Sequence, residues 1–142
     1  MSGIWQLLYR SVQAYEMETA DLMKLLFDAR SYNRENGITG LLLHHNGRFM
    51  QLLEGEQHEI RNLYRKIADD SRHLDVVVEI DAQASRRSFP AWQMGYAEAP
   101  EIDGHPALTG AGSERDAVAM LRLLSATDVC AQRLLQFLEE RA

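Results

Sequence analysis

Two apolar runs separated by an Asn-Gly pair place the strongest constraint on how this chain folds. Residues 38–44 and 49–54 are mostly apolar, and Asn46-Gly47 lies between them. An Asn-Gly pair in this position favours a tight turn that joins two antiparallel strands. Both runs are apolar at neighbouring positions rather than at every second one, as in strands that are buried on both faces. The fold therefore needs a layer of cover on each side of a sheet.

The rest of the chain alternates between strand and helix patterns. Residues 4–9, 76–80 and 91–97 favour strands because they are short and rich in apolar, aromatic or β-branched side chains. Apolar residues recur at helical spacing after Thr19, a candidate N-cap, as far as Asn36-Gly37. A second helical stripe contains Ile60, Leu63, Tyr64 and Ile67. The predicted class is α+β, a ferredoxin-like βαββαββ fold with a mixed five-stranded sheet and two helices on one face.

The C-terminal part of the sequence differs in composition from the rest. Residues 100–112 hold two of the three prolines and three of the nine glycines, which indicates a connector. Ser113 and Asp116 then resemble a capping box, and apolar residues follow at helical spacing. We predict a sensor-sized domain at residues 1–97, a connector at 98–112 and a helical extension at 113–142. The extension is expected to form two helices, packed on or near the free face of the sheet.

Composition excludes several classes of protein. The 142 residues include 15 Lys and Arg against 21 Asp and Glu, a net charge of −6, which argues against nucleic-acid binding. A membrane span needs about 20 apolar residues, and no run in this sequence approaches that length. The single cysteine, Cys130, excludes an internal disulfide and a cysteine-based zinc site. We expect a cytoplasmic domain without nucleic-acid or membrane partners.

Polar side chains on predicted apolar faces are the candidate functional residues. Gln51 shares a strand face with Phe49 and Leu53, Asn33 lies on the apolar stripe of the first helix, and Tyr9 lies on the first strand. Burying an amide without a partner costs about 1–3 kcal/mol. These groups could bond to the backbone or to one another. Alternatively, a planar ligand with donors and acceptors, held between the two helices, would satisfy all three.

Other polar residues give weaker signals. His44 and His45 are neighbours on a strand, point to opposite faces and cannot readily share a metal. Lys66 and Asp70 are spaced as an ion pair on the second helix, and Cys130 has the spacing of a core thiol. The sequence has no nucleophile elbow, phosphate-binding glycine loop or metal-ligand spacing. We therefore predict no catalytic residue and no metal.

Six motifs together resemble the BLUF domains, blue-light sensors that use flavin, from about residue 4 to residue 96. In order they are LLYRS at 7–11, ARSYN at 29–33, GITGLLL at 37–43, FMQLLEG at 49–55, DSRH at 70–73 and RSFPAWQMG at 87–95. Any one of these motifs is weak evidence, and their joint order and spacing make the match specific.

The resemblance implies roles for individual residues. Tyr9 corresponds to the redox-active tyrosine and Gln51 to the switching glutamine, with Trp92 and Met94 also assigned to the photoswitch. The implied cofactor contacts are Tyr9, Ser11, Arg30, Asn33, Ile38, Phe49, Gln51, Lys66, Asp70, His73 and Met94. The implied cofactor is FAD, with FMN and riboflavin left open. Blue light would drive electron and proton transfer from Tyr9 and a hydrogen-bond change at Gln51.

The resemblance also implies a receptor rather than an enzyme. The signal would leave through the last strand and the C-terminal helices, either to a downstream effector protein or to a change in a homo-oligomer. No effector domain is recognised after residue 112. Two alternatives share the predicted topology: a light-independent interaction module, and a small acylphosphatase-like hydrolase. The second is disfavoured because residues 10–15 lack the glycines of an anion-binding loop.

Overall fold

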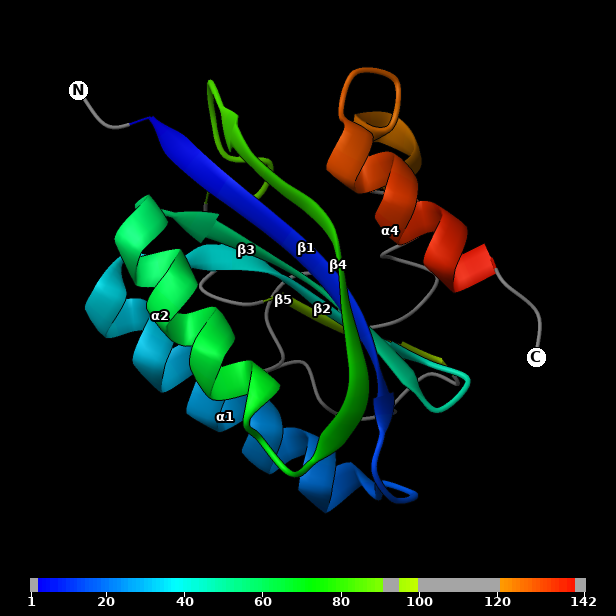
Figure 1. Cartoon of the computed structure of the whole chain (residues 1–142). Helices are drawn as coiled ribbons and strands as arrows, with labels where there is room; N and C mark the ends of the chain where they lie inside the picture. The colour runs from blue at the N-terminus through cyan, green and yellow to red at the C-terminus, as the bar shows by residue number, and fades with distance from the viewer. Residues whose placement is uncertain (1–2, 91–94, 100–120, 140–142) are drawn as a thin grey trace.

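The computed structural model describes residues 3–90, 95–99 and 121–139 of the chain. Its elements are β1 (Ile4–Gln13), α1 (Thr19–Asn36), β2 (Thr39–His45), β3 (Arg48–Gly55), α2 (Gln57–Ala68), β4 (His73–Ala84), β5 (Gly95–Ala99) and α4 (Val129–Glu139). This order confirms the predicted α+β class (Figure 1). Of the predicted last strand, residues 91–94 lie outside the described part.

The strands form one sheet in the order β4-β1-β3-β2-β5. Strand β1 pairs antiparallel with both β3 and β4, and β2 pairs antiparallel with β3. Strand β5 adds to the edge of the sheet parallel to β2. Strands β1 and β3, which contain Tyr9 and Gln51, are therefore direct neighbours in the interior of the sheet.

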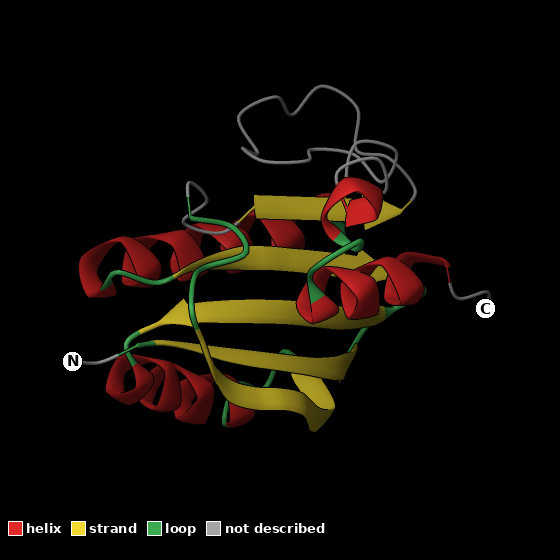
Figure 2. Cartoon of the chain, turned by 90° about the horizontal axis from the view of Figure 1, so that it is seen from above, coloured by secondary structure: helices red, strands yellow, loops and turns green. Residues whose placement is uncertain are grey.

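Apolar side chains on the two faces of the sheet form two separate cores. On one face, Leu7, Leu42 and Leu53 pack with residues of α1 and α2. On the other face, Leu8 and Leu52 pack with residues of α4. Figures 1 and 2 show α4 on the side of the strands away from α1 and α2. The double cover expected from the apolar runs of β2 and β3 is thus present.

The structure describes only part of the predicted helical extension. Residues 121–124 are helical and α4 follows from Val129. Leu121 is fully buried in the same core as Leu134 and Phe137 of α4. The predicted packing of this segment on the free face of the sheet is therefore observed for its described residues, and the remainder of the predicted first helix lies outside them.

Turns and helix ends follow local sequence signals in most places. Asn46 and Gly47 both have positive φ angles, 55° and 72°, as a tight hairpin turn requires. Gly37 ends α1 in the left-handed conformation, as predicted. The predicted cap at Thr19 is wrong by one residue: Glu18 is the N-cap, and its backbone N–H donates to Asp21 Oδ2 at 3.0 Å. Asp21 therefore supplies the capping contact from within the first turn.

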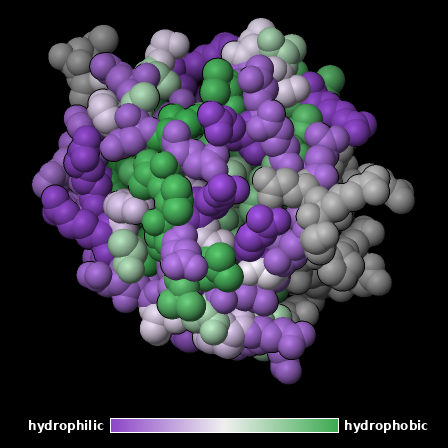
Figure 3. Space-filling view, turned by 45° about the vertical axis from the view of Figure 1, so that its right-hand side comes forward, coloured by the Kyte–Doolittle hydropathy of each residue, from purple (hydrophilic) through white to green (hydrophobic). Residues whose placement is uncertain are grey.

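Strand β4 forms an exposed edge of the sheet. Its side chains Leu74 and Val77 are 53% and 51% exposed. Figure 3 shows one face of the molecule, where hydrophobic side chains form a band bordered by hydrophilic ones. Among the described residues, no helix combines the length and apolar character that crossing a membrane requires.

The left-handed end of α1 gives a direct test of local backbone strain. A Cβ added at Gly37 would meet no atom within 4 Å, so Gly37→Ala introduces strain without a clash. We expect Gly37→Ala to lower the free energy of unfolding by about 1 kcal/mol, because a left-handed alanine is unfavourable. Urea denaturation measures the change. Gly37→Asn is the matched control and should lose less, and an alanine variant as stable as the wild type would contradict the assignment.

Candidate functional site

A cavity of about 210 Å³ lies between α1, α2 and the sheet. Its walls are mostly apolar, with Leu25 and Ala29 from α1 and Leu63 and Ile67 from α2. Tyr9, Phe49 and Gln51 form part of the sheet side. Asp70 and Arg72 come from the segment that joins α2 to β4, and His73 is the first residue of β4. The cavity therefore has an apolar interior, a phenol–amide pair on the sheet side and charged groups at one end.

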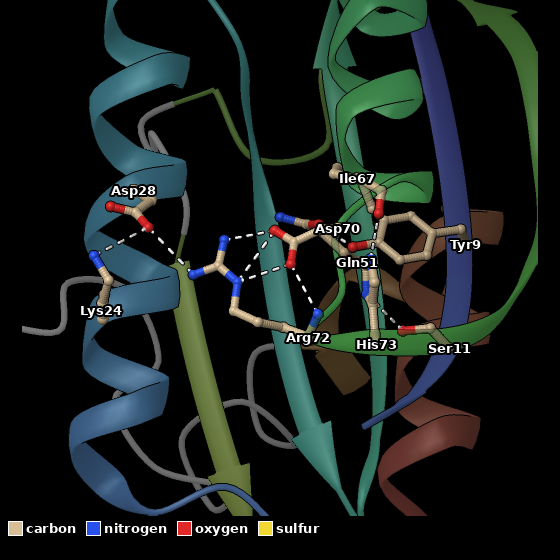
Figure 4. A network of polar contacts seen from close by, with 9 residues as sticks. All are labelled: Tyr9, Ser11, Lys24, Asp28, Gln51, Ile67, Asp70, Arg72 and His73. Atoms are coloured by element: carbon tan, nitrogen blue, oxygen red, sulfur yellow. Dashed lines mark hydrogen bonds and ion pairs between the residues drawn. The ribbon is translucent and has the colours of Figure 1, made fainter. Parts of the chain in front are cut away.

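Tyr9 and Gln51 form a hydrogen-bonded pair on the sheet side of this cavity. They are direct partners in the β1–β3 register, and the Tyr9 hydroxyl donates to Gln51 Oε1 at 2.5 Å. Both side chains are buried, with exposed fractions of 2% and 4%. Burial, and to a lesser extent the nearby Asp70 and Tyr64, raises the pKa of Tyr9 far above its ordinary value. The phenol is therefore a neutral donor that holds the Gln51 carbonyl oxygen in one orientation (Figure 4).

His73 is held beside Tyr9 by contacts at both ring nitrogens. Its Nε2 lies 2.5 Å from the carbonyl oxygen of Ile67, and its Nδ1 lies 3.0 Å from Ser11 Oγ. A carbonyl oxygen can only accept, so Nε2 carries a hydrogen and Nδ1 can accept from the Ser11 hydroxyl. The ring meets Tyr9 edge-on at a centroid distance of 6.0 Å. These contacts tie β1, α2 and β4 together at the cavity wall.

Arg72 joins two carboxylates at the charged end of the cavity. Its Nη2 lies 2.6 Å from Asp70 Oδ2, and its Nη1 lies 3.2 Å from Asp28 Oδ2 on α1 (Figure 4). The hydrogen bonds from Arg72 lower the pKa of Asp70 despite an opposing effect of burial. The predicted Lys66–Asp70 ion pair on one helix is wrong. Helix α2 ends at Ala68, and the Asp70 carboxylate accepts hydrogen bonds from Arg72. Lys66 Nζ instead lies 4.4 Å from the centre of the Tyr32 ring.

The structure brings together six of the predicted site residues at the cavity. These are Tyr9, Phe49, Gln51, Lys66, Asp70 and His73. Four others, Ser11, Arg30, Asn33 and Ile38, are not among the lining residues. Ser11 contacts His73, whereas Asn33 and Ile38 are buried, with Ile38 in the same core as Tyr9. Partial burial lowers the pKa of Arg30. Trp92 and Met94 lie outside the described residues.

Sequence reasoning missed Asp28, Tyr32 and Arg72 as cavity residues. Asp28 and Tyr32 are four residues apart on α1 and share a face with the predicted apolar stripe. This helical spacing is the sequence signal that could have identified them as cavity residues. Arg72 belongs to the DSRH motif, but only the fold shows that it reaches α1. These residues add charge and an aromatic ring to the end of the cavity formed by α1.

The other polar candidates have structural contacts. The ring of His44 packs on Phe49, at a centroid distance of 4.8 Å, and the ring of His45 faces Phe137, at 6.0 Å. The two histidines therefore face opposite sides of the sheet, as predicted. Within the described ranges, no group of three or more His, Cys, Asp or Glu side chains is arranged to hold a metal ion. Burial raises the pKa of the Cys130 thiol to about 12.

With fold and cavity established, comparison with known proteins identifies the family. A family model described as BLUF, sensors of blue-light using FAD, matches residues 4–95. This chain belongs to that family of flavin-binding blue-light sensors, which confirms the resemblance seen in the sequence.

Relatives and solved structures agree with this placement. The chain is 37% identical over 108 residues to photoactivated adenylate cyclase subunit beta of Euglena longa, covering 75% of this chain and 13% of that protein. A structure of Klebsiella pneumoniae BlrP1 with FMN and cyclic diGMP matches with a TM-score of 0.76 and 28% identity, over 96% of this chain and 35% of that one. The dark state of BlrB, a BLUF protein, matches with a TM-score of 0.67 and 26% identity, over 91% and 86%. The chain spans about an eighth of the length of this cyclase subunit, 13% for the Euglena longa protein and 12% for that of Euglena gracilis.

The Asp70–Arg72 contact predicts a defined pH dependence of stability. Because Arg72 lowers the pKa of Asp70, the contact stabilises the folded state at and above about pH 3.9, the pKa of an unfolded Asp, and this contribution is lost as the pH falls further. We expect Asp70→Asn to lower the free energy of unfolding at pH 7 by about 1 kcal/mol, since partial exposure screens the pair.

Urea denaturation between pH 3 and pH 7 measures this contribution. The difference between wild type and Asp70→Asn should shrink toward the acidic end. Asp69→Asn is the control, because Asp69 is an exposed neighbour. An Asp70→Asn difference that stays constant over this pH range would contradict the assignment.

Proposed function

We propose that the cavity holds the isoalloxazine ring of a non-covalently bound flavin, and that Tyr9 and Gln51 form its photoswitch. The observation that carries this proposal is the buried Tyr9–Gln51 hydrogen bond on the sheet side of a mostly apolar cavity. A neutral phenol and a carboxamide, fixed next to each other and shielded from water, suit proton-coupled electron transfer followed by a hydrogen-bond change.

The chemistry of the lining residues fits a flavin. An aromatic tricycle has large apolar faces and a polar edge, and this cavity combines aliphatic walls from α1 and α2 with polar groups at the sheet. Charged side chains at one end of the cavity would meet a ribityl phosphate portion. When bound, the flavin supplies absorption of blue light and an excited state that accepts an electron.

Tyr9 supplies the electron and the proton in this proposal. Its hydroxyl is protonated and donates to Gln51 Oε1 in the structure described here. Loss of the phenolic proton removes that donor, so nothing holds the Gln51 carbonyl oxygen toward β1. The amide can then rotate or tautomerise, because its two ends are similar in shape and opposite in hydrogen-bonding role. When the electron and proton return to Tyr9, the amide would remain rearranged, and Gln51 would present its other end to a bound flavin as the signalling state.

The remaining predicted residues receive supporting roles. We assign Asn33 to the polar edge of the ring and Ile38 and Phe49 to its apolar surroundings. Ser11 positions His73, which closes the wall beside Tyr9. Arg30, Lys66, Asp70 and His73 would contact the ribityl phosphate portion. Trp92 and Met94 are assigned to the border of the cavity and to signal output by the family resemblance alone.

FAD is the flavin we propose for this chain. The family description names FAD, whereas the BlrP1 structure cited above contains FMN, so both fit this fold. The purified holoprotein answers the question directly: denaturation releases the flavin, and chromatography with mass detection separates FAD, FMN and riboflavin. A colourless sample without a flavin spectrum would instead support the alternative function, a light-independent interaction module.

We further propose that the chain signals as a receptor, without catalysis of its own. In this proposal residues 1–97 sense light, and the connector at 98–112 and helical extension at 113–142 pass the change on. The recipient is a downstream effector protein or a second copy of the chain. Size-exclusion chromatography in darkness and under blue light tests the second possibility by the elution volume.

Substitutions at the phenol–amide pair test the photoswitch. Tyr9→Phe removes the phenolic proton, and Gln51→Leu removes the amide, while both keep a side chain of similar size. We expect each variant to retain bound flavin and to lose the reversible red shift of the flavin absorption band under blue light. Absorption spectroscopy before illumination, after it and during dark recovery measures the outcome.

Matched controls separate the site from general effects of these substitutions. Tyr15→Phe and Gln57→Leu make the same chemical changes at exposed positions outside the cavity. Both controls should show the wild-type shift. A normal photocycle in Gln51→Leu would refute the assignment of the switch.

A further inference from the structure

A second, partly buried polar cluster lies on the face of the sheet opposite the cavity. At its centre is Glu54 of β3, whose side chain is fully buried. Glu54 Oε2 accepts from Gln6 Nε2 at 2.7 Å and from the backbone N–H of Ser88 at 2.5 Å. Glu54 Oε1 accepts from the backbone N–H of Phe89 at 2.8 Å. One carboxylate thus ties β1, β3 and the segment after β4 together.

The cluster continues to the first turn of α4. Ser88 Oγ accepts from Gln6 Nε2 at 3.0 Å and donates to Asp128 Oδ2 at 2.5 Å. The other oxygen of Asp128, Oδ1, accepts the backbone N–H of Ala131 at 3.0 Å, which caps the helix. Cys130 Sγ also contacts Gln6 Oε1 at 3.6 Å. The Ser88 hydroxyl therefore links the sheet cluster to Asp128, the residue that caps α4, and the Cys130 contact is a second link to the same helix.

The cluster and the photoswitch occupy the same two strands. Gln6 pairs with Glu54 in the β1–β3 register, and Tyr9 pairs with Gln51 three residues further along. An odd separation places the two pairs on opposite faces of the sheet. A change in the position of β1 against β3, made at one pair, therefore reaches the other pair through the intervening backbone.

From this arrangement we infer that Gln6, Glu54, Ser88 and Asp128 are positioning residues that transmit the state of the Tyr9–Gln51 pair to the N-terminal end of α4. The inference rests on the proposed photoswitch and adds the route by which its output crosses the sheet. The route uses residues on β1, β3 and the 88–89 segment, and Asp128 directly before α4. It requires no contact between α4 and the cavity itself.

Removing the Ser88 hydroxyl tests the route with a small change. Ser88→Ala deletes the bonds to Gln6 and Asp128 and leaves the backbone N–H to Glu54 and the helix cap intact. In the full-length holoprotein, hydrogen–deuterium exchange of the α4 amides is measured by mass spectrometry in darkness and under blue light. We expect a light-dependent difference in the wild type and at least a threefold smaller one in Ser88→Ala, with an unchanged flavin red shift.

Two further variants make the result specific. Ser125→Ala is the matched control, because Ser125 precedes α4 and its hydroxyl bonds only to the carbonyl oxygen of Arg122 among the contacts described. It should keep the wild-type difference. Ser88→Thr restores a hydroxyl and should recover the response. A purely structural role for Ser88 would instead raise exchange equally in darkness and in light.

The outcomes separate the two proposals. Loss of the red shift in the wild type itself would refute the proposed photoswitch. A normal red shift with a full light-dependent exchange difference in Ser88→Ala would overturn the route through Ser88. A normal wild-type red shift with no light-dependent change at α4 would overturn the route as well, and would leave the photoswitch standing.

Discussion

The pairing register of β1 against β3 fixes both polar centres of this molecule. It sets Tyr9 opposite Gln51 on the cavity face and Gln6 opposite Glu54 on the α4 face. Both pairs are hydrogen-bonded and lie among apolar side chains. A slip of one residue would move every side chain to the other face and separate both pairs. The apolar packing of two cores against one sheet therefore protects the geometry on which the proposed photoswitch depends.

Burial makes each of these contacts nearly all-or-none. A buried donor or acceptor that loses its partner costs about 1–3 kcal/mol, so intermediate geometries are poorly populated. Burial raises the pKa of Tyr9 further above its ordinary value of about 10, so the phenol is protonated over the whole neutral pH range. In the proposed photoswitch, such a site would stay in one arrangement in darkness and would change arrangement as a unit. The apolar environment thus contributes to switching as well as to stability.

Local signals in the sequence predicted the parts of this fold that depend on neighbouring residues. The hairpin at Asn46-Gly47 and the end of α1 at Gly37 follow from left-handed conformations that few residues adopt. Polar residues on apolar faces also pointed to Tyr9 and Gln51. The position of Asp70 was misjudged because no glycine or proline marks the end of α2. The contacts from Arg72 to Asp28 and from Ser88 to Asp128 join residues 44 and 40 positions apart, and periodicity contains no information on such pairs.

Gln6 bonds to two acceptors through one amide nitrogen, so a displacement of β1 against β3 would favour one of these bonds over the other. Its Nε2 donates to both the Glu54 carboxylate and the Ser88 hydroxyl. If β1 moves relative to β3, the bond to the charged oxygen is the one retained, because charge-assisted hydrogen bonds are about twice as strong as neutral ones. Ser88 then loses a donor while its own hydroxyl still bonds to Asp128. The Ser88 bond to Asp128 is then the contact that changes, and it lies on the other oxygen of the carboxylate that caps α4. In the proposed route, a shift within the sheet would therefore reach the N-terminal end of that helix.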